Sequence, residues 1–181
     1  MKTKRILIVL LLVVVMGSGT VFAQGRFDIG IKAPLIIGVD GLVDADGQPI
    51  DLVEEVPSFI PIPSAFVGGQ LDLAIIKLGV GLQLYSAIIQ TIMYPAVFGE
   101  VDLGFFVANL TVGGGVFASF GVLGSDISTT ELLIPDLSAH FRLGSIFQVG
   151  LGLTGFTGFE SIESDIFPYV GYFSAKVSLT F

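Results

Sequence analysis

The last segment of the chain alternates between apolar and polar positions. Apolar or small residues occupy the odd positions from Tyr169 to Phe181, and polar residues such as Lys176 and Ser178 occupy most of the even positions. A period of two places the two kinds of side chain on opposite faces of a β-strand. The segment therefore predicts a strand with one apolar face and one polar face.

The same period recurs in seven earlier segments, which are 26–39, 64–74, 78–85, 94–103, 108–120, 132–143 and 147–154. The connections at 75–77, 104–107 and 144–146 are short, whereas those at 40–62, 86–93, 121–131 and 157–166 are longer. Short turns at one end and long loops at the other are typical of barrels that span a membrane. We therefore predict an all-β fold, an eight-stranded antiparallel up-and-down transmembrane β-barrel over residues 24–181.

Charged side chains inside these segments fall on the polar face. Because a charge that faces lipid near the bilayer midplane costs about 2 to 4 kcal/mol, this placement predicts that the polar face lines the interior. Eight of these residues are expected to form a charge network toward the short turns: Arg26, Asp28, Lys32, Asp72, Glu100, Asp102, Arg142 and Lys176. Since buried charges are normally paired, we expect the network to plug the interior, with a gated ion path as the alternative.

The composition agrees with a membrane protein. Hydrophobic residues make up 52% of the 181 residues, charged residues make up 13%, and the mean hydropathy is +0.90. No apolar stretch after the first two dozen residues is long enough for a transmembrane helix. A soluble lipocalin-like cup would turn its apolar side chains inward, and the few charges of this chain would hardly cover its outside. Cysteine is absent, which excludes disulfides and thiolate metal sites.

Residues 1–23 are expected to be a cleaved signal peptide. Lys2, Lys4 and Arg5 precede an apolar core at 6–16, and residues 21–23 provide a cleavage motif that ends at Ala23. The apolar core rises only about 16 Å as a helix, which is too short to anchor the chain in a bilayer. Cleavage leaves five cations against 16 acids, a formal charge of −11, which argues against a nucleic-acid surface.

The acids outside the strands gather in the longer connections, which predicts acidic extracellular loops. They are Asp40, Asp44, Asp46, Asp51, Glu54, Glu55, Asp126, Glu131, Glu160, Glu163 and Asp165. The first connection also carries apolar residues, so we expect residues 40–62 to cover the barrel mouth or to form an adhesive surface for a protein partner. Asp44 and Asp46 lack the remainder of an EF-hand loop, so no metal site is predicted.

Catalytic chemistry finds little support in the sequence. Ser138 and His140 share the polar face two residues apart, an arrangement that a nucleophile and its base would use. However, His140 is the one histidine of the chain, and a lone histidine is more often a structural group. We therefore predict no enzymatic activity and no cofactor.

The final ten residues, 172–181, form an alternating strand that ends in the aromatic Phe181. Together with the leader and the eight strands, this ending resembles the small bacterial outer-membrane β-barrel proteins. The resemblance implies a location in the bacterial outer membrane, contact with its lipid, and recognition of Phe181 as an insertion signal by the barrel-insertion machinery. A non-enzymatic structural or surface-interaction role is the expected function.

The inward face toward the long loops is largely apolar. Seven aromatic residues are expected there: Phe66, Tyr85, Tyr94, Phe98, Phe117, Phe156 and Tyr172. They indicate either a packed aromatic core or a chamber that resembles those of outer-membrane barrels that accept small hydrophobic molecules. Glycines such as Gly113 and Gly152 either leave room for a cavity or permit barrel curvature. Ile36 is expected on the same face, shortly after Pro34, where the first strand is predicted to bulge or to end early.

Overall fold

The computed structural model describes residues 23–43, 49–55, 60–87, 89–158 and 167–181. The strands in these parts of the chain are β1 (Ala23–Val43), β2 (Pro49–Glu55), β3 (Ile62–Leu73), β4 (Ile76–Ala87), β5 (Gln90–Asp102), β6 (Phe106–Gly121), β7 (Gly124–Leu143), β8 (Phe147–Gly155), β9 (Thr157–Gly158) and β10 (Phe167–Thr180). Within the described ranges, no helix is long and apolar enough to cross a membrane. The predicted signal peptide lies outside the described residues except for Ala23.

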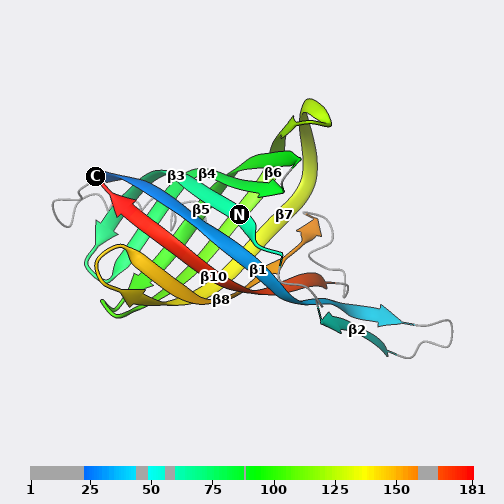
Figure 1. Ribbon diagram of the computed structural model, residues 1–181, viewed down its shortest axis with the longest axis horizontal. Coiled ribbons are helices and arrows are strands. Elements are labelled where there is room, and N and C mark those ends of the chain that lie inside the picture. Colours follow the sequence, from blue (N-terminus) through cyan, green and yellow to red (C-terminus); the bar gives the residue numbers. More distant parts are fainter. Residues whose placement is uncertain (1–22, 44–48, 56–59, 88, 159–166) are drawn as a thin grey trace, which may run out of the picture.

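Eight of the strands close into one antiparallel barrel (Figure 1). β1, β3, β4, β5, β6, β7, β8 and β10 follow one another around the wall, and β10 pairs with β1 to close it. At the end of this seam, Gly25 and Phe181 exchange two backbone hydrogen bonds of 2.7 and 3.0 Å. The predicted eight-stranded up-and-down barrel is therefore confirmed. The two further strands lie at the barrel's long-loop end, where β2 pairs with β1 and β9 pairs with β7.

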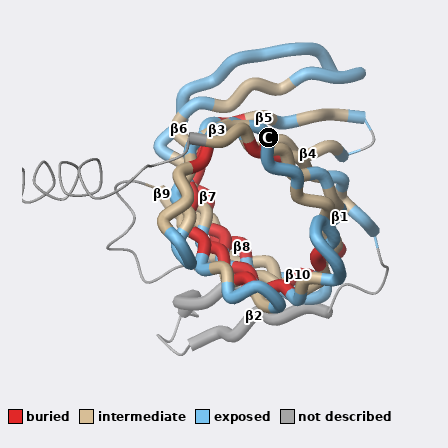
Figure 2. Tube along the Cα trace, turned by 90° about the vertical axis from the view of Figure 1, so that its left-hand side faces the viewer, coloured by how far each residue is buried: buried red, intermediate tan, exposed pale blue. Residues whose placement is uncertain are grey.

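The side chains sort between the inside and the outside as the alternation predicts. Gln70, Gln148, Glu100 and Val107 are the largest fully buried side chains, and all but the valine are polar. Aliphatic side chains such as Val80 and Leu151 are about 60% exposed on the outside. Buried positions line the ring of strands when the barrel is viewed from its end (Figure 2). This arrangement is the inverse of a soluble barrel and suits a wall that faces acyl chains.

Two of the predicted longer connections are wrong. β4 extends to Ala87 and β5 begins at Gln90, so the expected connection 86–93 is mostly strand. β6 and β7 are likewise separated by Val122 and Leu123 alone, so 121–131 is not a long loop. The N-terminal part of β7 has polar side chains on both faces, as in Ser125-Asp126 and Ser128-Thr129-Thr130. The alternation is therefore lost from the sequence there, although the backbone pairing with β6 continues.

The first strand bulges after its proline, as expected. The register of β1 against β10 shifts between Pro34 and Ile36, which leaves Leu35 as the extra residue. One extra residue inverts the side-chain alternation, so Ile36 pairs with Gly171 on the outer face and is 39% exposed. The predicted inward position of Ile36 is therefore wrong. Beyond the bulge, β1 also pairs with β2, so part of the expected loop 40–62 is a β-hairpin.

Candidate functional site

The predicted charge network assembles around Arg26 on β1. Its Nη2 lies 2.8 Å from a carboxylate oxygen of Asp28 and 2.8 Å from one of Glu100. Arg26 and Glu100 are each 2% exposed, so each charge depends on its partner rather than on water. The guanidinium also packs 4.5 Å from the ring centroid of Phe98. We define the lower charge cluster as Arg26, Asp28, Gln70, Asp72, Lys77, Glu100, Asp102, Arg142 and Lys176.

Further ion pairs link the lower charge cluster across the lumen. Asp102 accepts hydrogen bonds from Lys77 at 2.8 Å and from Arg142 at 2.7 Å. Lys176 lies 3.7 Å from Asp28, and Gln70 connects Arg26 to Asp72 by accepting from one and donating to the other. The structure therefore brings together seven of the eight residues of the predicted network, with Lys32 lying apart from them.

Lys77 is a member of the cluster that the sequence interpretation missed. The alternation predicts Lys77 in a short connection, yet β4 begins at Ile76 and the ammonium group of Lys77 contacts Asp102 at 2.8 Å and Glu100 at 3.8 Å. Extending the alternation of β4 backward from Tyr85 by twos would have placed Lys77 inside. With this residue included, every lysine and arginine after the predicted leader lies in the lumen: Arg26, Lys32, Lys77, Arg142 and Lys176.

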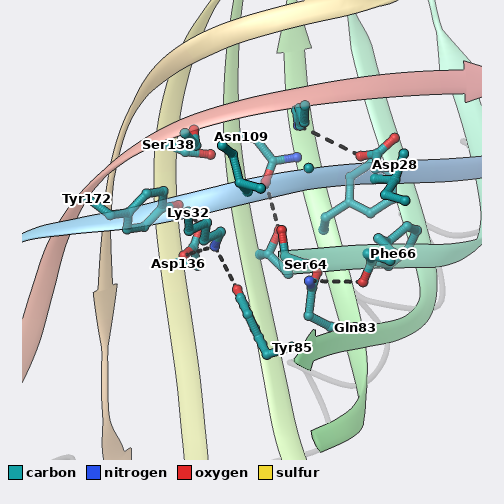
Figure 3. A pocket seen from close by; sticks show the side chains of 18 of the residues that line it. Asp28, Lys32, Ser64, Phe66, Gln83, Tyr85, Asn109, Asp136, Ser138 and Tyr172 are labelled. Atoms are coloured by element: carbon teal, nitrogen blue, oxygen red, sulfur yellow. Dashed lines mark hydrogen bonds and ion pairs between the residues drawn. The ribbon is translucent and has the colours of Figure 1, made fainter. Parts of the chain in front are cut away.

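A second polar site surrounds Asp136 on β7 (Figure 3). Its carboxylate accepts hydrogen bonds from the Lys32 ammonium at 2.7 Å, the Tyr172 hydroxyl at 2.7 Å and the Thr154 hydroxyl. Lys32 also donates to the Tyr85 hydroxyl at 2.6 Å. Both carboxylate oxygens thus accept hydrogen bonds, as a buried carboxylate requires, since Asp136 is only 7% exposed. We refer to these five residues as the Asp136 site.

The two residues considered as a nucleophile and its base are not paired with each other. His140 Nε2 lies 2.8 Å from Ser174 Oγ, which belongs to β10. Ser138 is 6% exposed on the same face of β7, and its hydroxyl is not the hydrogen-bond partner of the histidine. His140 therefore links β7 to β10 through Ser174, and it is not hydrogen-bonded to Ser138.

The aromatic residues of the predicted chamber pack on one another. Phe66, Tyr94 and Phe98 form a buried core with Ala96 and Ile134, and the partly buried residues Tyr85, Phe117, Leu132 and Phe156 pack against it. The ring centroids of Phe66 and Phe98 lie 5.3 Å apart with their planes almost perpendicular. Tyr94 and Phe117 are also separated by 5.3 Å. These separations are within the range of stabilising ring contacts.

Glycines opposite the rings provide the space that the rings occupy. Added Cβ atoms would collide with aromatic side chains at several lumen positions: with Phe98 at Gly79, Phe66 at Gly81, Tyr94 at Gly113 and Tyr172 at Gly152. Two of these pairs are direct cross-strand neighbours in the sheet register. The volume that these glycines leave free is therefore filled by side chains from adjacent strands, an arrangement that also stabilises glycine in a sheet.

A small cavity with a mixed polar and apolar lining remains among the Asp136 site, the aromatic rings and the top of the lower charge cluster. Its volume is about 60 Å³, and Asn109, Ser64 and Ser138 are among the polar residues that line it (Figure 3). Such a volume has room for a few water molecules. Pockets for small-molecule ligands usually measure about 300 to 1,000 Å³.

These observations define a transmembrane β-barrel. The closed ladder pairs the backbone groups of the wall, aliphatic side chains face outward, and charges pair inside.

The fold is similar to those of three solved small outer-membrane β-barrels. The N-terminal β-barrel domain of Pseudomonas aeruginosa OprF shares 10% identity over 86% of this chain and 100% of that chain, with a TM-score of 0.43. Neisserial surface protein A (NspA) shares 7% identity over 86% and 98% of the chains, with a TM-score of 0.45. Ail, the attachment invasion locus protein of Yersinia pestis, shares 9% identity over 87% and 99%, with a TM-score of 0.39. No protein-family model and no curated protein matches the sequence.

Proposed function

We propose that this chain is an integral protein of a bacterial outer membrane, in which a closed barrel supports surface-exposed segments and carries out no catalysis. The observation that carries the proposal is the pairing of charges in the lumen. Five cations and five acids meet there in ion pairs and hydrogen bonds, and the rings above them pack together. A lumen filled in this way supports a structural barrel rather than a wide pore.

The distribution of the remaining charges supports a surface role. The described acids outside the lumen lie in β1, β2 and β7, toward the end of the barrel opposite Phe181, and the lysines and arginines after the leader all lie in the lumen. Asp126 and Glu131 are exposed at this end. An acidic end without cations favours partners that carry positive charge.

A narrow conduit or a receptor for small hydrophobic molecules is the competing function. Either one needs continuous space along the lumen, whereas the described side chains leave a cavity of about 60 Å³. The aromatic rings that would line such a chamber lie in contact with one another. These contacts favour the structural role.

Conductance in planar bilayers separates the two functions. We expect the purified, folded barrel to give no reproducible channel events, because paired charges and packed rings fill its interior. Phe98→Ala and Tyr172→Ala remove rings from the lumen and serve as matched variants. Reproducible conductance of the unmodified barrel that changes in these two variants would contradict the structural role and establish a conduit.

A further inference from the structure

The β6–β7 hairpin continues well beyond the barrel wall. Residues 116–121 of β6 pair with residues 124–129 of β7, and we name this part, including its turn, the distal hairpin. The hairpin turns away from the wall in Figure 1, and it lies outside the ring of strands in Figure 2. It therefore leans away from the barrel axis instead of covering the mouth.

The bend occurs where the membrane-spanning part of β6 should end. Gly114 and Gly115 have φ angles of +130° and +80°, which side-chain-bearing residues rarely adopt, and the register of β6 against β7 shifts at this point. Residues 106–113 of β6 precede these two glycines and make up most of the about 9 to 11 residues that a transmembrane strand needs. The distal hairpin therefore starts near the outer boundary of the apolar layer.

The two faces of the distal hairpin differ in their share of apolar side chains. Phe117 packs against the lumen residue Tyr94, so its face is turned toward the barrel mouth. That face also carries Ser119, with Asp126 and Ser128 as cross-strand partners, because directly paired residues share a face. The opposite face is the more apolar one: it carries Val116, Ala118, Phe120 and Ile127, with Ser125 and Thr129 as its polar members, and Ile127 is 75% exposed.

The apolar face continues the lipid-facing side of the barrel. Even positions of β6 point outward within the wall, as Leu110 does with 50% exposure, and even positions remain outward beyond the bend. The turn adds Val122 and Leu123, which are 83% and 76% exposed. Gly121 and Gly124 flank these two residues, and Gly124 supplies the positive φ of the turn. The turn geometry therefore does not explain why its two central residues are aliphatic.

We propose that the distal hairpin is a lipid-binding element that lies on the outer leaflet of the membrane crossed by the barrel, with Val122 and Leu123 inserted at the boundary between headgroups and acyl chains. The inference rests on the proposed function, because it requires the barrel to span that membrane. The contact is apolar in character, since the distal hairpin contains no lysine or arginine and its acid, Asp126, is on the opposite face. Aliphatic side chains on such an element gain free energy when they leave water for the acyl boundary.

Quenching of single tryptophans by lipid tests the proposal, because the chain contains no native tryptophan. Ile127→Trp and Ser128→Trp place the probe on opposite faces of the same strand, and Leu137→Trp places it on the lipid-facing wall. Each full-length variant is folded into phosphatidylcholine vesicles with or without bromine on the acyl chains. We expect emission from Ile127→Trp to fall by a factor similar to that of Leu137→Trp, and emission from Ser128→Trp to remain nearly unchanged.

The three probes distinguish the failure of this inference from the failure of the barrel's membrane location. If Leu137→Trp is quenched and Ile127→Trp is not, the barrel spans the bilayer and the lipid-binding hairpin is refuted. If Leu137→Trp is also unquenched in folded protein, the membrane location itself is refuted. Emission from Ile127→Trp that shifts with protein concentration, without quenching by bromine, would mean contact between copies and would also overturn the proposal.

Discussion

Single residues in the lumen are stabilised by the charges and rings that face them. Asp136 illustrates this dependence, since its two oxygens accept from Lys32, Tyr172 and Thr154. Removing one of two paired charges leaves the other buried without a partner, which destabilises the fold. Removing both charges leaves no unpaired charge in the interior. The energetic role of each residue is therefore set by its neighbours on other strands.

The Asp136 site gives a direct test of this dependence. We expect Asp136→Leu to lower the free energy of unfolding by about 3 to 5 kcal/mol, because it leaves the Lys32 ammonium unpaired. The double variant Lys32→Met with Asp136→Leu should recover much of the loss. Urea unfolding in lipid vesicles, followed by the heat-dependent shift of the folded band on gels, measures both. A double variant that is as unstable as the single one would contradict the ion-pair explanation.

The ring–glycine pairs predict different effects for two neighbouring glycines. A Cβ at Gly79 would collide with the Phe98 ring and with the carbonyl oxygen of Gly69, whereas a Cβ at Gly99 would meet Leu78 at an ordinary 3.6 Å. We expect Gly79→Ala to destabilise the barrel by about 1 to 3 kcal/mol, as overpacking does. Gly99→Ala, the control, should change stability by about 0.5 kcal/mol or less. Equal losses of stability for Gly79→Ala and Gly99→Ala in the same unfolding assay would contradict the conclusion that the Phe98 ring fills the space beside Gly79.

At the scale of elements, the alternation is most regular where each strand crosses the expected bilayer. Leu137 on β7 lies between Leu110 and Leu153 on the neighbouring strands, and all three are exposed. Near the ends of the strands the pattern weakens, because both faces of β7 around Ser125 and Ser128 are exposed. The eight strands of the barrel wall were therefore predicted in number and order, whereas β2, β9 and the ends of β4, β5, β6 and β7 were not.

Charge substitution on the outer wall tests the depth of an element in the membrane. We expect Leu137→Arg to lower the stability of the barrel in vesicles by about 2 to 4 kcal/mol, because the guanidinium would face acyl chains near the midplane. Leu103, in the turn after β5, is 51% exposed. Leu103→Arg should cost only about 0 to 1 kcal/mol, since this site is near the interface. Equal losses would contradict the assigned depth.

The whole molecule depends on closing the sheet between its first and last strands. Arg26 pairs with Thr180, and the backbone hydrogen bonds between Gly25 and Phe181 complete this seam. The ring of Phe181 lies against Gly25 and is 80% exposed, so its removal deletes little buried surface. The terminal aromatic is thus accessible to an external partner at the end where the short turns lie.

Deletion of Phe181 tests the predicted insertion signal. In a Gram-negative host, we expect the deletion to reduce the fraction of protein recovered in the outer membrane, while the purified chain still folds into lipid vesicles. Phe141→Ala, which removes an exposed aromatic near the same end, should leave recovery close to that of the unmodified protein. Mature protein found soluble in the periplasm without the deletion would refute the outer-membrane location.

The sequence alone determined which face of each strand is apolar, because side-chain direction in a strand depends only on position by twos. That rule placed Arg26, Glu100 and Arg142 inside before any partner was known. The partners themselves depend on the register between strands far apart in the chain, which decided that Lys77 joins Glu100 and Asp102 and that His140 meets Ser174. Pro34 indicated a bulge in the first strand, but the pairing with β10 decided that Leu35 is the extra residue and that Ile36 turns outward. The bend at Gly114 and Gly115 was decided by the tertiary structure alone.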